Sequence, residues 1–479
     1  MASSSKQADQ KFSRSALIAL VIGSMVGSGI FALPASFGRA TGALGAMTAW
    51  LIAGTGMLML AFVFQTLSRR KPDLDAGIYA YAKAGFGDYV GFASAAGYWI
   101  GCCLADVACL VLIKATLGQF FPVFGDGSTA VAIASASILL WCVHFLVLRG
   151  IRGAAALNTI ATYAKIIPIC LFIVTAIIAF DGKVFSSNFW GTEQPDFSSV
   201  FAQVRGTMLL TVFVFVGIEG ASVYSRYARD RADIGFATLV GFLTVLSFLV
   251  SVTLLSYGVL PRPELAGLAT PSMAGVMESI VGRWGSVFIS VALLISILGN
   301  YLSWSLLAAE ILHSAAVNRT MPSFLAGVNA HEVPVGALWL TNCVIQAFLL
   351  VTWFAEYAFS LALKMTSAMT LIPYFFVAAY GLKLAALGET YHAGESARTV
   401  DWVRSAVATL YTAGMIYAGG TKFLLLSSIL YAPGTLLFFL AKREREEAIF
   451  RPLEAVTFAV LTIAAFAGVY ALAVGAISI

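Results

Sequence analysis

The chain has 479 residues, of which 60% are hydrophobic and only 11% are charged, and its mean hydropathy is +0.89. So few charged side chains could not cover the surface of a water-soluble domain of this length. The composition therefore indicates an all-α polytopic membrane protein. The formal net charge of +5 fits basic loops beside a lipid bilayer and does not indicate a nucleic-acid surface.

Apolar runs of about 20 residues or more recur along the chain and predict transmembrane helices. Lysines and arginines gather at alternate ends of these runs, which favours a cytoplasmic tail at residues 1–13 and hence a cytoplasmic N-terminus. About 12–13 helices are expected, at residues 14–40, 43–67, 90–118, 129–148, 155–180, 204–225, 234–260, 285–316, 335–355, 357–386, 402–419, 421–441 and 452–476.

The first run is interrupted by glycine and serine between Gly23 and Gly29. Unwound backbone inside a membrane persists only against protein or beside a cavity, because its N–H and C=O groups need partners. The sequence therefore predicts a helix that breaks at mid-membrane and offers backbone groups to a small polar ligand.

A second interruption lies in the sixth run, at residues 216–220, and contains the acidic Glu219. Breaks five helices apart are typical of a five-plus-five inverted repeat with a site at the bilayer midplane. The repeats would occupy residues 14–180 and 204–386, with additional C-terminal helices at 402–479. The alternative is a helix-packing face, since Gly217 and Ala221 lie four residues apart.

Several separated motifs resemble one transporter family. Gly27–Phe31 with Pro34 is similar to the substrate loop of the amino acid–polyamine–organocation transporters, and residues 213–222 resemble their sixth helix. Further likeness, to the basic amino acid antiporter branch and most closely to bacterial arginine/ornithine antiporters, is carried by Tyr98, Trp99, Asp106, the run Trp304–Leu307, Thr370, Pro373 and Tyr374. The resemblance implies a LeuT-like fold with discontinuous helices 1 and 6, a bacterial inner-membrane location and a possible homodimer.

An amino acid presents a carboxylate, an α-ammonium and a side chain. The N–H groups of Ser28–Phe31, at the start of a half-helix, suit the carboxylate. The carbonyls near Ile22–Ser24 and Phe215–Val216 suit the ammonium. The residues expected to line the substrate site are Ile22, Gly23, Ser24, Gly27, Ser28, Gly29, Ile30, Asp106, Phe213, Phe215, Val216, Gly217, Trp304 and Thr366.

Asp106 lies among apolar residues and cysteines in the third run. A carboxylate at mid-membrane costs about 3 kcal/mol on insertion scales, which favours a role as counter-ion for a cationic substrate side chain. The alternatives are a structural acid paired with Lys114 and a protonated carboxyl group. Trp304 is expected to stack on the same cation, unless it is a membrane-interface tryptophan.

Aromatic and hydroxyl side chains complete the expected lining. Phe213 and Phe215 are candidate lids over the substrate, with plain packing as the alternative. Thr366 either faces the substrate or bonds back to its own helix.

Three more charged residues are candidates for coupling or gating. Glu219 and Glu310 could link protonation to gating, with structural anchoring as the alternative for each. Lys165, in the fifth run before Pro168, could place an ammonium near the breaks where relatives of this fold use sodium. Its alternative is an amine that reaches back to water.

We therefore expect a secondary active transporter that exchanges cationic amino acids, namely arginine for ornithine, with lysine as a further candidate substrate. The alternative is a proton-coupled lysine or polyamine permease, and an ion channel is disfavoured because no filter repeat is present. No enzyme, cofactor or metal site is expected, because the four histidines show no metal-ligand spacing.

Overall fold

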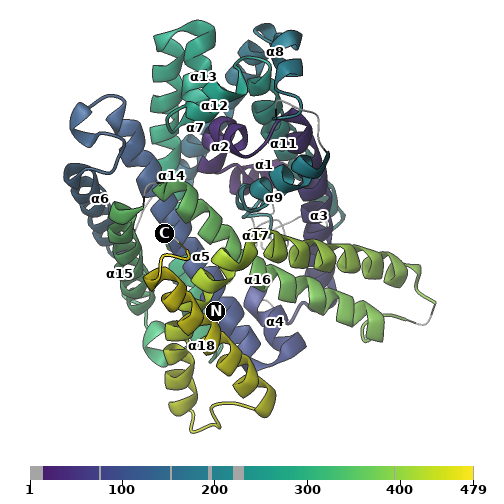
Figure 1. Ribbon diagram of the computed structural model, residues 1–479. Coiled ribbons are helices and arrows are strands. Elements are labelled where there is room, and N and C mark those ends of the chain that lie inside the picture. Colours follow the sequence, from purple (N-terminus) through teal and green to yellow (C-terminus); the bar gives the residue numbers. More distant parts are fainter. Residues whose placement is uncertain are drawn as a thin grey trace.

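The computed structural model describes residues 14–74, 77–150, 154–192, 197–219, 231–355, 357–392 and 394–477. This part of the chain is helical (Figure 1), and the β-type pairing recorded in it is an isolated bridge between Val328 and Pro334. The predicted tail at 1–13 and the end of the second motif, residues 220–222, lie outside the described residues.

The helices follow the order of the apolar runs. Their bounds are α1 Arg14–Met25, η1 Ser28–Ala32, α2 Leu33–Ala40, α3 Ala43–Arg70, α4 Ile78–Phe86, α5 Asp88–Gly118, α6 Ala130–Leu148, α7 Ala154–Ile178, α8 Gly182–Ser187, α9 Phe197–Phe213, α11 Arg231–Tyr257, α12 Arg262–Gly267, α13 Ser272–Val281, α14 Arg283–Val317, α15 Val335–Val351, α16 Ala358–Leu387, α17 Ser396–Arg443 and α18 Pro452–Ala473.

Among the described residues, ten helices are long and apolar enough to cross a membrane, and the bent pair Leu17–Met25 and Ser28–Ala40 makes an eleventh span. The prediction of 12–13 helices differs from this number at two places. α9 is shorter, at Phe197–Phe213, because the helix ends at the second break, where residues 214–219 form turns. The predicted runs 402–419 and 421–441 are two helical segments within α17, separated at Gly420, whose φ of +77° is not helical. The chain is thus a multi-pass membrane protein.

α5 crosses the middle of the bundle (Figure 1) and packs against α4, α14 and α16. Of its most apolar stretch, 89% is buried by protein, so this helix has little contact with lipid. Small residues allow the close packing, since a Cβ atom at Gly101 would lie 2.8 Å from the hydroxyl oxygen of Thr370 on α16. A polar side chain on α5 therefore faces protein or an internal cavity.

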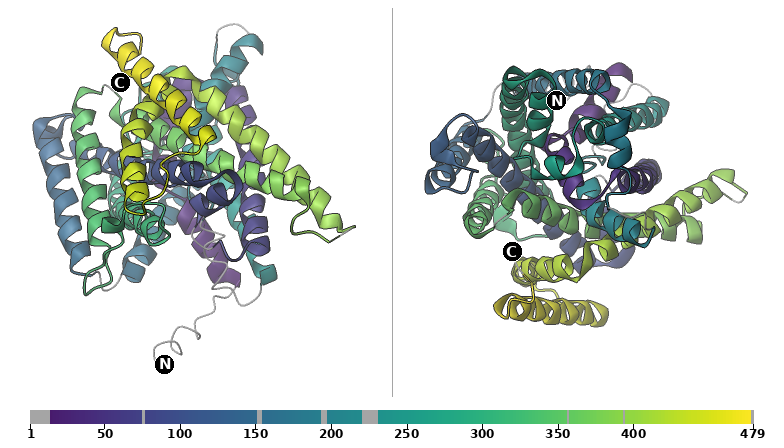
Figure 2. Two further views of the ribbon diagram at one scale, coloured as in Figure 1. Left: turned by 90° about the horizontal axis from the view of Figure 1, so that it is seen from below. Right: turned by 45° about the horizontal axis from the view of Figure 1, so that its top comes forward.

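α18 lies at the margin of the bundle, beside α17 (Figure 2), and only 11% of its apolar stretch is buried. At the C-terminal end of α3, Arg70 forms ion pairs with Glu395 at 2.6 Å and with Asp401 at 3.4 Å. Its guanidinium also lies 3.6 Å from the ring centre of Tyr391. These contacts hold the end of α3 against the connection between α16 and α17.

Candidate functional site

The first helix breaks between Met25 and Ser28, with a bend of 46° between its two parts. The N–H of Val26 still bonds to the carbonyl of Ile22 at 2.9 Å, which completes the last turn of α1. Gly27 is extended, with φ −102° and ψ −170°, and η1 begins at Ser28. The first N–H groups of a helix have no partner within the helix, so this buried turn presents donors at the break.

The second break touches the first. α9 ends at Phe213 and residues 214–219 form turns. Gly217 has φ +108°, and a Cβ atom there would lie 2.4 Å from the carbonyl oxygen of Ser24. Phe213 lies against the first break, because a Cβ at Gly29 would be 2.9 Å from its ring. Glycine is required at 217 for both its backbone angle and this close approach.

The Glu219 carboxylate is buried and links the second break to two long helices. It accepts hydrogen bonds from the hydroxyl groups of Tyr98 on α5 and, at 2.5 Å, Tyr374 on α16. The backbone N–H of Gly217 donates to the same carboxylate at 3.2 Å. Glu219 therefore fixes the turn after the break, which is the anchoring role that the sequence left open beside gating.

Lys165 places its ammonium beside the first break. The side chain is 3% exposed, and Nζ donates to the carbonyl oxygen of Gly23 at 3.5 Å. A positive charge at a carbonyl that ends a half-helix is electrostatically favourable. This contact differs from the alternative in which the amine reaches back to water.

Asp106 is fully buried on α5. Neither of its carboxylate oxygens has a hydrogen-bond partner among the described residues. The predicted alternative of a pair with Lys114 is absent, since the Lys114 ammonium donates to Thr352 at 3.2 Å. A buried carboxylate without a partner is costly, and the counter-ion for a cationic substrate and the protonated carboxyl group are the two predictions for Asp106 that remain.

Three residues that the sequence did not single out surround this part of α5. Cys109, one turn beyond Asp106, lies 3.9 Å from Ser28 Oγ and 3.5 Å from Asn300 Nδ2. The hydroxyl of Tyr301 is buried and also has no partner in the described part of the chain. The sequence signal that could have identified them is their position near Asp106 and Trp304 in the chain. Helical spacing alone, however, does not show which helices face each other.

Four further predicted residues are placed as follows in the structure. Phe215 is fully buried and stacks on Phe242 with ring centres 5.1 Å apart, which is the packing alternative for this residue. Thr366 bonds back to the carbonyl of Ala362 at 2.8 Å. Trp304 is half-buried against the core, and Glu310 is exposed on α14.

The broken first helix, its contact with the second break and the unpartnered carboxylate at their side define a multi-pass membrane transporter with a central polar site. The amino acid permease family model matches residues 12–419. The chain belongs to this family, whose members are transporters and not enzymes.

Similar proteins match over nearly the whole chain. One is an arginine/ornithine antiporter of Pseudomonas aeruginosa, 51% identical over 98% of each chain. Another is an L-lysine transport protein of Corynebacterium glutamicum, 41% identical over 97% of this chain and 95% of the relative. A third is an arginine/agmatine antiporter of Chlamydia caviae, 37% identical over 95% of each chain.

Proposed function

We propose that this protein exchanges cationic amino acids across the membrane by alternating access, with L-arginine and L-ornithine as its principal substrates. The observation that carries the proposal is the fully buried Asp106 carboxylate, which has no partner among the described residues. Such a group is rarely idle inside a membrane, and a guanidinium or ammonium group would satisfy it. The names of the similar proteins, which are transporters of cationic amino acids, support the same class of substrate.

The backbone would recognise what all amino acids share. The N–H groups from Ser28 to Ile30, at the start of η1, would bind the carboxylate. The carbonyls from Ile22 to Ser24, at the end of α1, would accept from the α-ammonium. Asp106 would then select a cationic side chain, and Trp304 would stack on it with roughly 0.5–2 kcal/mol.

Exchange of two substrates with the same charge moves no net charge and needs no ion gradient. Lys165, with its ammonium at the Gly23 carbonyl, would hold a positive charge there throughout the cycle. Glu219 would release Tyr98 and Tyr374 when the site opens on their side. The protein would act in the bacterial cytoplasmic membrane with its N-terminus inside, as a monomer or a homodimer.

A proton-coupled lysine permease is the second candidate, and the observation that favours it is the 41% identity to an L-lysine transport protein. Both candidates use the same cation subsite, so they differ in the driving force. Liposomes that contain the purified protein separate them. Saturable uptake of labelled arginine only after preloading with arginine or ornithine supports exchange, whereas uptake into empty liposomes under a proton gradient supports the permease.

Asp106→Asn tests the cation subsite. The amide keeps the shape of the side chain but removes its charge, so we expect arginine exchange to fall at least about tenfold while the protein still folds. Asp126→Asn, in an exposed loop, is the matched control and should exchange like the wild type. Undiminished arginine exchange by Asp106→Asn contradicts the assignment.

A further inference from the structure

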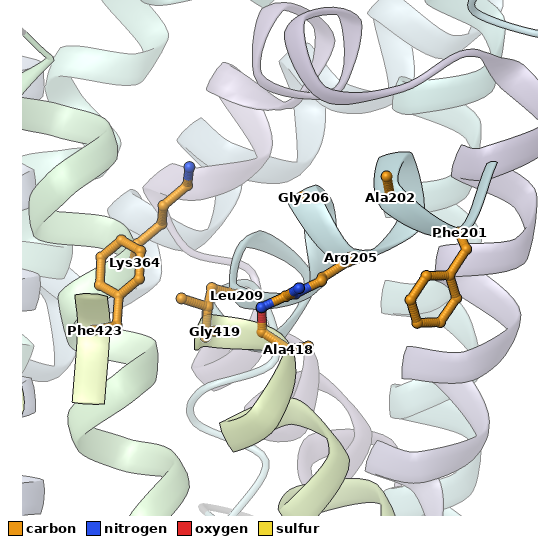
Figure 3. Close-up of a pocket in the computed structure, with 9 residues that line it drawn as sticks. All are labelled: Phe201, Ala202, Arg205, Gly206, Leu209, Lys364, Ala418, Gly419 and Phe423. Carbon is orange, nitrogen blue, oxygen red and sulfur yellow. The ribbon is translucent and has the colours of Figure 1, made fainter. Parts of the chain in front are cut away.

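A pocket of about 410 Å³ lies between α9, α16 and the kink of α17 (Figure 3). Arg205 and Lys364 supply its charged side chains, and no acidic residue is among the nine residues that line it. Phe201, Leu209 and Phe423 supply most of its apolar wall. Its charge is unexpected beside the path of a cationic substrate.

The positive charge extends beyond the lining residues. Lys364 interacts electrostatically with Lys422 and Arg39. Lys364 is half-buried and makes no hydrogen bond or ion pair within the described part of the chain. Arg205 donates through Nε to the carbonyl of Ala418 at 3.3 Å, and its guanidinium lies 5.6 Å from the ring centre of Tyr417. Two cationic side chains thus retain N–H groups that can bind an anion.

The pocket lies beside the part of α9 that leads into the second break. Leu209, in its wall, accepts a hydrogen bond from Ser367 on α16 at 2.6 Å, and Lys364 lies two residues before Thr366. The second break begins one helical turn beyond Leu209, after Phe213. The α9 residues of the pocket precede the break in the chain and Glu219 is at its other end. With the N-terminus in the cytoplasm, as proposed, α9 begins on the outer side of the membrane, and the pocket is assigned to that side.

We propose that this pocket is an outer vestibule that receives the α-carboxylate of an incoming amino acid and thereby disfavours amines that lack one. This inference rests on the proposed function. Arginine carries a carboxylate and one net positive charge, whereas agmatine has no carboxylate and two positive charges. A cluster of lysines and arginines attracts the carboxylate of the first and repels the second more strongly. The vestibule thus discriminates between arginine and agmatine. Asp106 cannot do so, because both ligands present the same guanidinium group to it.

The test measures the external selectivity for amino acid over amine. Cells that lack their own arginine uptake and express the full chain are preloaded with ornithine, and labelled arginine uptake is competed by external agmatine or arginine. We expect Lys364→Gln to lower the half-inhibitory concentration of agmatine by about threefold or more relative to that of arginine. Raised ionic strength should also lower the half-inhibitory concentration of agmatine relative to that of arginine for the wild type, because salt screens the exposed charges.

Matched variants separate the charge from other effects. Lys364→Arg, which keeps the charge, should retain the wild-type ratio, and so should Lys183→Gln, which removes an exposed lysine on α8 away from the pocket. If Lys364→Gln does not fold, Lys422→Gln is measured instead, with the same expected direction. An unchanged ratio in folded Lys364→Gln or Lys422→Gln overturns the vestibule.

Two further results are distinguishable. No exchange by the wild type would overturn the proposed function itself. Wild-type exchange, with the same agmatine-to-arginine inhibition ratio in the wild type and Lys364→Gln, overturns only the vestibule.

The phosphate group of an anionic lipid is also an anion that the lysine and arginine of the pocket would attract. Purified protein in phosphatidylcholine liposomes with and without phosphatidylglycerol tests this source. If the anionic lipid stimulates the wild type but not Lys364→Gln, and selectivity is unchanged, the pocket belongs to lipid and the vestibule is overturned.

Discussion

Gly217 joins the two helix breaks at a point where no side chain fits. Its φ of +108° is unfavourable for any other residue, and the carbonyl oxygen of Ser24 would lie 2.4 Å from an added Cβ. This contact places the second break against the end of α1, whose carbonyl groups are proposed to accept from the substrate ammonium. The residue therefore affects both the stability and the shape of the site.

Gly217→Ala should lower the stability by at least about 1–3 kcal/mol, the typical magnitude for a strained backbone conformation, and should abolish exchange. The measurement is thermal unfolding in detergent together with uptake in liposomes. Gly414→Ala is the control, because a Cβ there meets nothing within 4 Å and α17 is helical at that position. Equal melting temperatures for the two variants would contradict the steric argument.

The end of α3 and the connection between α16 and α17 are held by charge. Arg70 donates to Glu395 at 2.6 Å, and this hydrogen bond lowers the pKa of Glu395. Burial, with the Asp401 carboxylate as a further cause, raises the pKa of Tyr391 to about 12, so its hydroxyl remains a donor to Asp401 at 3.1 Å. The helices in this region are thus joined by a network and not by one pair.

The Glu395 contribution depends on pH with a defined sign. Because its pKa is lower in the folded than in the unfolded protein, the carboxylate stabilises the fold above its ordinary pKa of about 4.3. That stabilisation is lost as the pH falls through the lower, folded-state pKa. We expect the wild type to melt slightly above Glu395→Gln at pH 7 and the two to converge in acid.

Glu389→Gln is the control for this comparison, since Glu389 lies 3.8 Å from Lys71 in a more exposed pair. Its melting temperature should follow the wild type across the same pH range, because surface pairs contribute little. A difference between wild type and Glu395→Gln that persists at the lowest pH would contradict the role of the ionised carboxylate.

Opening of the whole molecule on the Glu219 side requires that α5, α16 and the second break separate. Tyr98 and Tyr374 both donate to the Glu219 carboxylate, so these hydrogen bonds join α5 and α16 to the second break. In the proposed alternating access, contacts of this kind would break on one side of the helix breaks and form on the other side.

Tyr374→Phe should favour opening, because it removes one hydrogen bond of about 1 kcal/mol that joins α16 to the second break. A cysteine at buried Ala378, one turn further along α16, should then react about fivefold faster with a membrane-impermeant thiol reagent. Tyr411→Phe is the control, since the Tyr411 hydroxyl has no partner in the described chain. Equal reaction rates in the two backgrounds would contradict the closing role of Tyr374.

The sequence by itself determined the class of protein, the positions of most helices and the two breaks. These properties are local, because hydropathy over about 20 residues and a run of glycines are both read from adjacent positions. The same local reading ended one helix at residue 419, began the next at residue 421 and identified Asp106 as an intramembrane acid. Membership of the amino acid permease family confirms the transporter class.

Only the tertiary structure decided which of these residues meet. The structure brings Gly217 against Ser24, two tyrosine hydroxyl groups to Glu219 and the Lys165 ammonium to Gly23, and these contacts join segments far apart in the sequence. It also leaves Asp106 without a hydrogen-bond partner among the described residues. The rotation of each helix about its axis sets such contacts, and packing against all neighbours fixes that rotation. The basic pocket at Lys364 was invisible in the sequence for the same reason, since its cations come from separate helices.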